Sequence, residues 1–344
     1  MMLSETKNEL EAGLGKPASL LDMKMWILAG AVLLLPIVLP YKALASEILI
    51  YALAAASFNI LLGFTGMLSF GHGALFGVGA YATGLLLKEL GWHPLAGLLA
   101  GALGGMMTAL VMGLLSIRRI GLYFVMLTLA FNQLAYFIAY QWKQLTGGED
   151  GLLNVPRPDL SLLPGLRLPL QSNLQFFLFV WVLFMISMIL IRRVLRSPFG
   201  RVLVAIKENP DRAKAVGYNI QAYKLVAFII SGIFTALAGG LYALFMRMVP
   251  ITSIQLFTST DLIIMSLLGG TGSLYGPIVG AVITKVASEI LSQIWPRWLL
   301  GLGATFVVFV LFMRGGVWAF LAALWNRARL GKELIRKRPG ASRL

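Results

Sequence analysis

The stretch RRVLRSPFGRVLVAIKENPDRAKAVG, residues 192 to 217, is a charged interruption in an otherwise apolar chain. Its two acidic residues are Glu208 and Asp211, and its seven basic residues are Arg192, Arg193, Arg196, Arg201, Lys207, Arg212 and Lys214. Apolar segments flank it on both sides, and so many charges cannot lie in hydrocarbon. Because Lys and Arg gather on the cytoplasmic side of membrane proteins, the stretch predicts a cytoplasmic helical loop, placed where a partner could push on it.

Composition places the rest of the chain in a membrane. Of 344 residues, 58% are hydrophobic and only 12% are charged, whereas a soluble domain carries about 25% charged residues. The formal net charge of +15 would suggest nucleic acid for a soluble chain. Here the basic residues lie beside apolar runs, so we expect contact with a lipid bilayer and no nucleic-acid partner.

Catalytic and metal-binding patterns are missing from the sequence. The chain has no cysteine and two histidines, His72 and His93, which are too few for a metal cluster. Lys16 follows a glycine but precedes a proline and has no upstream glycine, so it does not belong to a phosphate-binding loop. We therefore expect no enzyme activity, no cofactor and no metal. If transport uses ATP, a separate subunit must hydrolyse it.

Runs of about 20 apolar residues are long enough to cross a bilayer. They predict an all-α protein with about ten transmembrane helices, some short or broken by glycine, near 25–40, 44–62, 69–87, 94–116, 120–141, 173–191, 222–246, 256–269, 274–295 and 299–313. With an even count, every strong basic cluster falls on the inner side. The expected organisation is a cytoplasmic tail (1–24), a permease domain (25–313) with an outer loop (142–171), and a basic cytoplasmic tail (314–344).

The pattern Leu-Leu-Gly-x-Thr-Gly-x-Leu occurs twice, at 61–68 and 267–274. It suggests an internal duplication. In the ten-span arrangement the two copies enter the membrane in the same direction, and an error of one span would make them inverted. Irregular backbone within a membrane must face protein or water, so the two glycine-rich breaks are interpreted as the translocation path. The candidate path residues are Asn59, Gly63, Thr65, Gly66, Ser69, Gly71, His72, Gly73, Gly269, Gly270, Thr271 and Gly272. For His72, simple packing between helices is the competing interpretation.

Two further patterns are interpreted as structural. Lys285 and Glu289 lie four residues apart, so they share one helix face and are expected to neutralise each other. Small residues recur every four positions in two stripes, which favours close helix packing within the subunit over a dedicated dimer face. These stripes are Gly97, Gly101 and Gly105, and Gly232, Ala236 and Gly240.

Most of the chain between residues 50 and 285 resembles the permease subunits of bacterial ABC importers for branched-chain amino acids, most closely those of the LivM type. The stretches that carry the resemblance are NILLGFTGMLSFGHGALFGVGAYA (59–82), GLYFVMLTLAFNQL (121–134), LTGGEDGL (145–152), SPFGRVLVAIKENPDRAKAVGYN (197–219), YKLVAFIISGIFTALAGGLYA (223–243) and LLGGTGSLYGPIVGAVI (267–283).

The resemblance implies a complex in the bacterial inner membrane with a second, different permease subunit, two cytoplasmic ATPases and a periplasmic solute-binding protein. It implies that segment 197–219 couples to the ATPase through Lys207, Glu208, Asn209, Asp211, Arg212, Ala213 and Gly217. The chain departs from the importers' Glu-Ala-Ala signature by reading Asp-Arg-Ala at 211–213, which leaves the docking acidic residue open. The loop Gly147, Gly148, Glu149, Asp150 and Gly151 is similar to an element that distinguishes the M-type subunit from its partner permease.

The sequence leaves alternatives for the solute and for the class of protein. Related permeases take up urea or short-chain amides, so the resemblance leaves the solute open. An ion-coupled secondary transporter would need paired carboxylates within the membrane, and the sequence shows no such pattern. A membrane-embedded enzyme would need a catalytic pair, which is missing as well.

Overall fold

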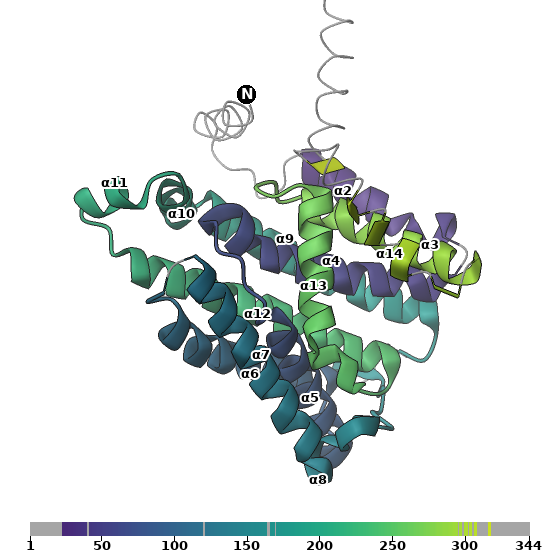
Figure 1. Cartoon of the computed structure of the whole chain (residues 1–344). Helices are drawn as coiled ribbons and strands as arrows, with labels where there is room; N and C mark the ends of the chain where they lie inside the picture. The colour runs from purple at the N-terminus through teal and green to yellow at the C-terminus, as the bar shows by residue number, and fades with distance from the viewer. Residues whose placement is uncertain are drawn as a thin grey trace, which may run out of the picture.

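The computed structural model describes residues 23–307, without 40, 120, 164, 165, 169, 295, 298, 302 and 305, together with 316 and 317. Helices make up almost all of this part and form a bundle (Figure 1), as expected for an all-α membrane protein. Both predicted tails, 1–24 and 314–344, lie almost entirely outside the described residues. The elements are α2 (Met23–Leu33), α3 (Leu35–Val38), α4 (Lys42–Thr65), α5 (His72–Leu90), α6 (Pro94–Ser116), α7 (Leu122–Gln141), α8 (Lys143–Thr146), η1 (Gly148–Asp150), β1 (Leu160–Leu163), β2 (Leu166–Leu168), α9 (Asn173–Arg196), α10 (Pro198–Glu208), α11 (Pro210–Ala215), α12 (Ile220–Met246), η2 (Ile251–Ile254), α13 (Leu256–Gly269) and α14 (Gly276–Ile294).

The predicted number of about ten crossing helices is not confirmed. In the described ranges, six helices are long and apolar enough to cross a membrane: α4, α6, α7, α9, α12 and α14. The other predicted spans are shorter apolar helices (Leu28–Val38 and Leu256–Gly269), the glycine-rich α5, and a segment mostly outside the described residues. Because neighbouring helices cover most of α5, this helix can cross the bundle without being strongly apolar.

Helix α12 packs on α4, α5 and α6, and small side chains let these helices approach closely. Gly105 lies directly against the Cβ atom of Ala236, while Gly101 and Gly240 lie against the Thr83 side chain from two different helices. A methyl group at any of these glycines would collide with its neighbour. The two predicted stripes of small residues therefore pack within the chain, which confirms the helix-packing interpretation.

Part of the surface is as apolar as the core. On α6, the side chains of Leu99, Leu103, Met107 and Val111 follow one another at intervals of four residues, and each is more than half exposed. A continuous exposed apolar stripe of this kind fits contact with lipid chains rather than with water.

The loops gather at the two ends of the bundle. Helices α10 and α11 lie at one end, and α8 lies at the opposite end (Figure 1). The loop that follows α8 contains the short antiparallel pair β1 and β2, in which Leu160 lies opposite Leu168. The predicted coupling segment and the predicted outer loop are thus separated by the length of the bundle.

Candidate functional site

The predicted coupling segment folds as two short helices, α10 and α11, held together by a small apolar core. Both helices begin at a proline, whose fixed backbone angle suits the first helical position. Val202, Ile206 and Ala213 are buried together, with Tyr223 of α12 packed beside them. The Tyr223 ring also stacks on that of Phe199, with 5.5 Å between centroids. Helices α10 and α11 are therefore attached firmly to α12, and their polar side chains remain exposed.

Both ends of α11 are fixed by specific local chemistry. At the start, the side-chain oxygen of Asn209 accepts a hydrogen bond from the Arg212 amide at 2.9 Å, which caps the helix. At the end, Gly217 has φ +98°, and the next amide, that of Tyr218, bonds back to the Ala213 carbonyl at 3.2 Å. A left-handed glycine with this return bond ends a helix sharply.

Of the predicted coupling residues, six have exposed side chains or backbone at this end of the bundle: Lys207, Glu208, Asn209, Asp211, Arg212 and Gly217. Ala213 is buried in the small core instead, at 5% exposure. The segment therefore combines an exposed polar surface with a buried anchor, as a docking element requires.

Lys207 connects the coupling segment to the first glycine-rich break. Its ammonium group donates a hydrogen bond of 2.7 Å to the main-chain carbonyl of Gly63, in the last turn of α4. Burial lowers the pKa of Lys207 below its ordinary value, and the neighbouring Glu208 acts in the opposite direction. The lysine stem also lies 3.3 Å from where a Cβ atom at Gly66 would be.

The two copies of the repeated motif meet at this same place. A Cβ atom at Gly63 would lie only 2.8 Å from the amide nitrogen of Gly272, so the two backbones are almost in contact. The side-chain amide of Asn59 donates to the Ser273 carbonyl at 2.9 Å. Gly66 follows the end of α4 and Gly270 follows the end of α13, and both glycines have positive φ. The C-terminal ends of α4 and α13 thus form one double glycine loop, 63–66 with 269–273.

Several predicted path residues are buried against the protein's own helices rather than facing an opening. His72 is fully buried, and its Nε2 atom lies 2.8 Å from the Ser231 hydroxyl. Because that hydroxyl donates to the Ser57 carbonyl at 2.6 Å, the histidine nitrogen must be the donor in the first bond. No described residue is a partner for Nδ1. These contacts are the ones expected if His72 packs between helices.

The first turn of α5, which follows the first glycine-rich break, is capped by side chains from other helices. The Ser259 hydroxyl accepts from the Gly73 amide at 2.7 Å, and the Asn132 side-chain oxygen accepts from the Ala74 amide at 2.6 Å. These bonds satisfy amides that have no partner within the helix itself. Thr65 and Ser69 are buried in the same region, whereas Thr271 is exposed.

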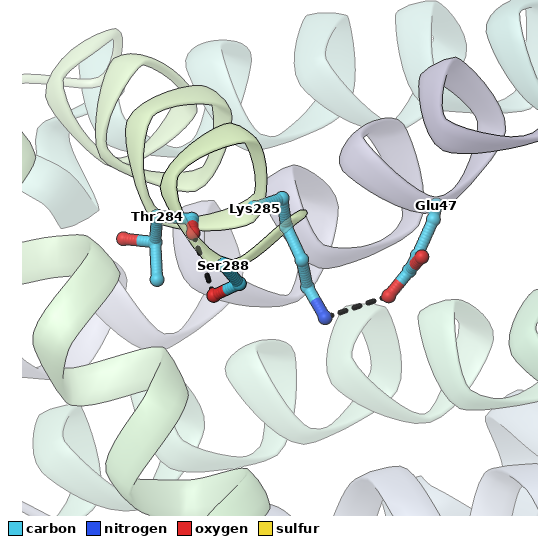
Figure 2. Close-up of polar contacts among 4 residues, drawn as sticks. All are labelled: Glu47, Thr284, Lys285 and Ser288. Atoms are coloured by element: carbon cyan, nitrogen blue, oxygen red, sulfur yellow. Dashed lines mark hydrogen bonds and ion pairs between the residues drawn. The ribbon is translucent and has the colours of Figure 1, made fainter. Parts of the chain in front are cut away.

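The expected pairing of Lys285 with Glu289 is wrong. The Lys285 ammonium instead lies 2.7 Å from a carboxylate oxygen of Glu47 on α4 (Figure 2). Glu289 accepts a hydrogen bond from Gln293 one turn further along α14, at 2.9 Å. Spacing along one helix could not reveal a partner 238 residues away in the sequence.

At the opposite end, three glycines with positive φ shape the predicted outer loop: Gly147, Gly148 and Gly151. Between them, Glu149 and Asp150 are exposed. A cavity of about 250 Å³ opens beside this loop, and its lining includes Lys88, Glu89, Lys143 and Asp150. This end therefore presents charges of both signs around a hollow.

Sequence reasoning missed Arg157, which anchors this loop. Its guanidinium group is buried and donates to the carbonyls of Leu244 and Phe245 at 2.8 and 2.6 Å, at the end of α12. It also lies 4.0 Å from the centre of the Phe176 ring. Burial lowers its pKa to about 10, aided by the nearby charge of Arg247. A lone arginine in a proline-rich loop gives no sequence signal for such a role.

Bundled apolar helices, a lipid-facing stripe and charged elements at both ends define a polytopic membrane protein. The chain belongs to the family described as the branched-chain amino acid transport system permease component, whose model matches residues 41–313. No solved structure matches the chain.

Three relatives illustrate the family. The chain is 27% identical over 324 residues to the high-affinity branched-chain amino acid transport system permease protein LivM of Escherichia coli K12, covering 86% of this chain and 75% of that protein. It is 28% identical to the LivM protein of Salmonella typhimurium LT2, covering 80% and 69%. It is 25% identical to the E. coli permease protein LivH, covering 70% and 82%.

Proposed function

We propose that this chain is a membrane-spanning subunit of an ATP-driven importer that passes branched-chain amino acids across the bacterial inner membrane. The observation that carries the proposal is the family match over residues 41–313, which spans both the double glycine loop and the charged helices α10 and α11. In this proposal the chain itself is not catalytic, and ATP is hydrolysed by two separate cytoplasmic subunits.

The proposed ATPase contact is the exposed surface of α10 and α11. Its carboxylates and guanidinium group, from Glu208, Asp211 and Arg212, are free to meet a partner, while Ala213 and Gly217 hold the shape. Lys207 joins this surface to the carbonyl of Gly63. Movement imposed on α10 by a partner would therefore reach the double glycine loop directly, without passing through a flexible linker.

The double glycine loop is the proposed moving part of the translocation path. Gly66, Gly270 and Gly272 adopt angles that side chains resist, so the backbone there can rearrange where other residues could not. Most of the side chains proposed to line the path, including Asn59 and His72, are buried in this structure. They would meet a solute only in another state, as alternating access requires.

The remaining parts of the proposal concern topology and assembly. We propose about ten spans with both termini in the cytoplasm, because this arrangement keeps the basic clusters on one side. The Gly147 to Gly151 loop would then face the periplasm and a solute-binding protein. The second permease would be a different chain, as the existence of both LivM and LivH relatives suggests.

The test is reconstitution of the whole importer in proteoliposomes, with both permeases, the ATPase and the binding protein. We expect uptake of labelled leucine, isoleucine or valine that requires ATP. A matched preparation with an ATPase variant that cannot hydrolyse ATP is the control. Uptake that persists in this control would contradict the ATP-driven mechanism, and uptake of urea or acetamide in place of leucine would contradict the substrate.

A further inference from the structure

A charged cluster lies among three of the helices, α4, α13 and α14, away from the double glycine loop. Lys285 of α14 and Glu47 of α4 form an ion pair of 2.7 Å, and their side chains are 14% and 28% exposed (Figure 2). The ammonium group also lies 3.4 Å from the centre of the Tyr51 ring. Charges within apolar helices are costly and are usually retained for a function.

A second carboxylate belongs to the same cluster. Asp261 lies in the second turn of α13, a helix that packs on both α4 and α14, and it interacts electrostatically with Lys285 and Glu47. In the described part of the chain, however, Lys285 pairs with Glu47, and no ion pair joins Asp261 to a base. The cluster thus has two carboxylates for one ammonium group, and the partly buried Asp261 has no ion-pair partner of its own among the described residues.

Aromatic rings form one wall of the cluster. Tyr51 stacks on Phe76 with 5.8 Å between ring centroids and meets the edge of Tyr242 at 5.7 Å. Together with the charged groups, these rings place apolar surface beside groups of both signs. The partial exposure of Glu47 and Lys285 shows that the cluster is open on one face of the chain.

We propose that Asp261, Glu47 and Lys285 form a binding station for the zwitterionic head group of an amino acid on its way through the permease. The solute's ammonium group would lie between the carboxylates of Asp261 and Glu47, and its carboxylate would bind the ammonium group of Lys285. The two charged groups of the solute would then lie beside the Glu47–Lys285 pair, each against the group of opposite sign. The apolar side chain of the solute would lie against the aromatic wall at the partly exposed Tyr242.

The location of the cluster suits such a station. Glu47 and Asp261 lie in the first two turns of α4 and α13, and both helices end at the double glycine loop. The station therefore lies toward the far ends of the two helices whose other ends carry the proposed moving part. A solute bound there would contact the same helices that the coupling segment acts on.

This inference rests on the proposed function only in taking an amino acid as the solute, and the test separates the two. Leucine uptake is measured in proteoliposomes that contain the complete importer, with wild type, Asp261→Asn and the control Glu289→Gln. Glu289 is a carboxylate of α14 that pairs within its own helix. We expect Asp261→Asn to lower uptake at least about tenfold at unchanged assembly, and Glu289→Gln to have little effect.

The charge exchange Glu47→Lys with Lys285→Glu gives a second readout. It keeps an ion pair but reverses the order of charges, so thermal stability should be preserved while uptake stays low. Restored uptake in the exchanged pair would show a purely structural role and overturn the inference. The same conclusion would follow if Asp261→Asn behaved like Glu289→Gln, or if it released the second permease, because Asp261 would then pair with that subunit. If wild type itself takes up no leucine, the proposed function fails instead.

Discussion

The ammonium group of Lys207 on α10 donates a hydrogen bond to the carbonyl of Gly63 in the last turn of α4, over 2.7 Å. Gly63 in turn lies against the backbone of Gly272, in the second copy of the repeated motif. One side chain thus connects an exposed pair of helices to the place where the two copies meet. We propose that this connection carries the movement of a partner subunit into the membrane.

The end of α11 depends on a backbone angle that proline cannot adopt. Gly217 has φ +98°, whereas proline is fixed near about −65°. We expect Gly217→Pro to abolish ATP-dependent uptake while the protein still inserts into the membrane. Asparagine tolerates left-handed angles better than other residues with a side chain, so Gly217→Asn should keep most activity. Equal uptake by the proline variant and wild type would show that the shape of this turn is irrelevant to coupling.

The exposed carboxylates of the coupling segment should contact the ATPase. The chain contains no cysteine, so a single cysteine at position 211 can be cross-linked without background. We expect Asp211→Cys to cross-link to the ATPase in the assembled importer, and Asp159→Cys, exposed in the predicted outer loop, to give no such product. The reversal Glu208→Lys with Asp211→Lys should abolish uptake at normal membrane levels. Cross-linking at position 159 alone would reverse the proposed orientation.

Close packing between α5 and α12 predicts a large difference between two glycines. A Cβ atom at Gly79 would collide with the backbone of Ala236, whereas one at Gly104 would meet its nearest neighbours at 3.6 Å, an ordinary contact. We expect Gly79→Ala to lower the free energy of unfolding by about 1–3 kcal/mol, as overpacking does. Gly104→Ala should be neutral or slightly stabilising. Thermal unfolding of the purified protein, followed by tryptophan fluorescence, measures both, and equal melting temperatures would refute the close approach.

Arg157 should stabilise the outer loop far more than its neighbour Arg247. Removing the Arg157 side chain leaves the carbonyls of Leu244 and Phe245 without their charged donor. We expect Arg157→Met to cost about 1.5–3 kcal/mol of stability, the usual worth of hydrogen bonds to a charged group. Arg247 is exposed and bonds only to the Gln171 side chain in the described residues, so Arg247→Met should cost about 0.5 kcal/mol or less. A larger loss for Arg247→Met than for Arg157→Met would contradict this anchor.

Local features of the fold could be predicted from the sequence because they depend on neighbouring residues. Apolar runs located the long helices, and the charged stretch 192–217 located the helical segment that contains α10 and α11. The spacing of small residues in α6 and α12 predicted close packing. The number of crossing helices was harder to predict. Neighbouring helices cover α5 and α13, so these two need not be as long or as apolar as helices that face lipid.

Contacts between distant segments could not be predicted in the same way. The repeat pointed to two special glycine loops, but only the fold shows that Gly63 and Gly272 touch. Lys285 had an acidic neighbour at the favoured spacing along its own helix, yet Glu47 on another helix is its partner. The role proposed for Asp261 could not be predicted from the sequence, because a single carboxylate forms no pattern until the fold places Lys285 and Glu47 around it.

Leucine transported per ATP hydrolysed, measured on Lys207→Met in proteoliposomes holding the complete importer, decides whether α10 drives transport. The matched control is Lys214→Met, an exposed lysine of α11. If the bond to Gly63 transmits the movement, Lys207→Met will still hydrolyse ATP but will move at least about tenfold less leucine per ATP, and Lys214→Met will resemble wild type. An unchanged ratio for Lys207→Met would contradict the proposed coupling.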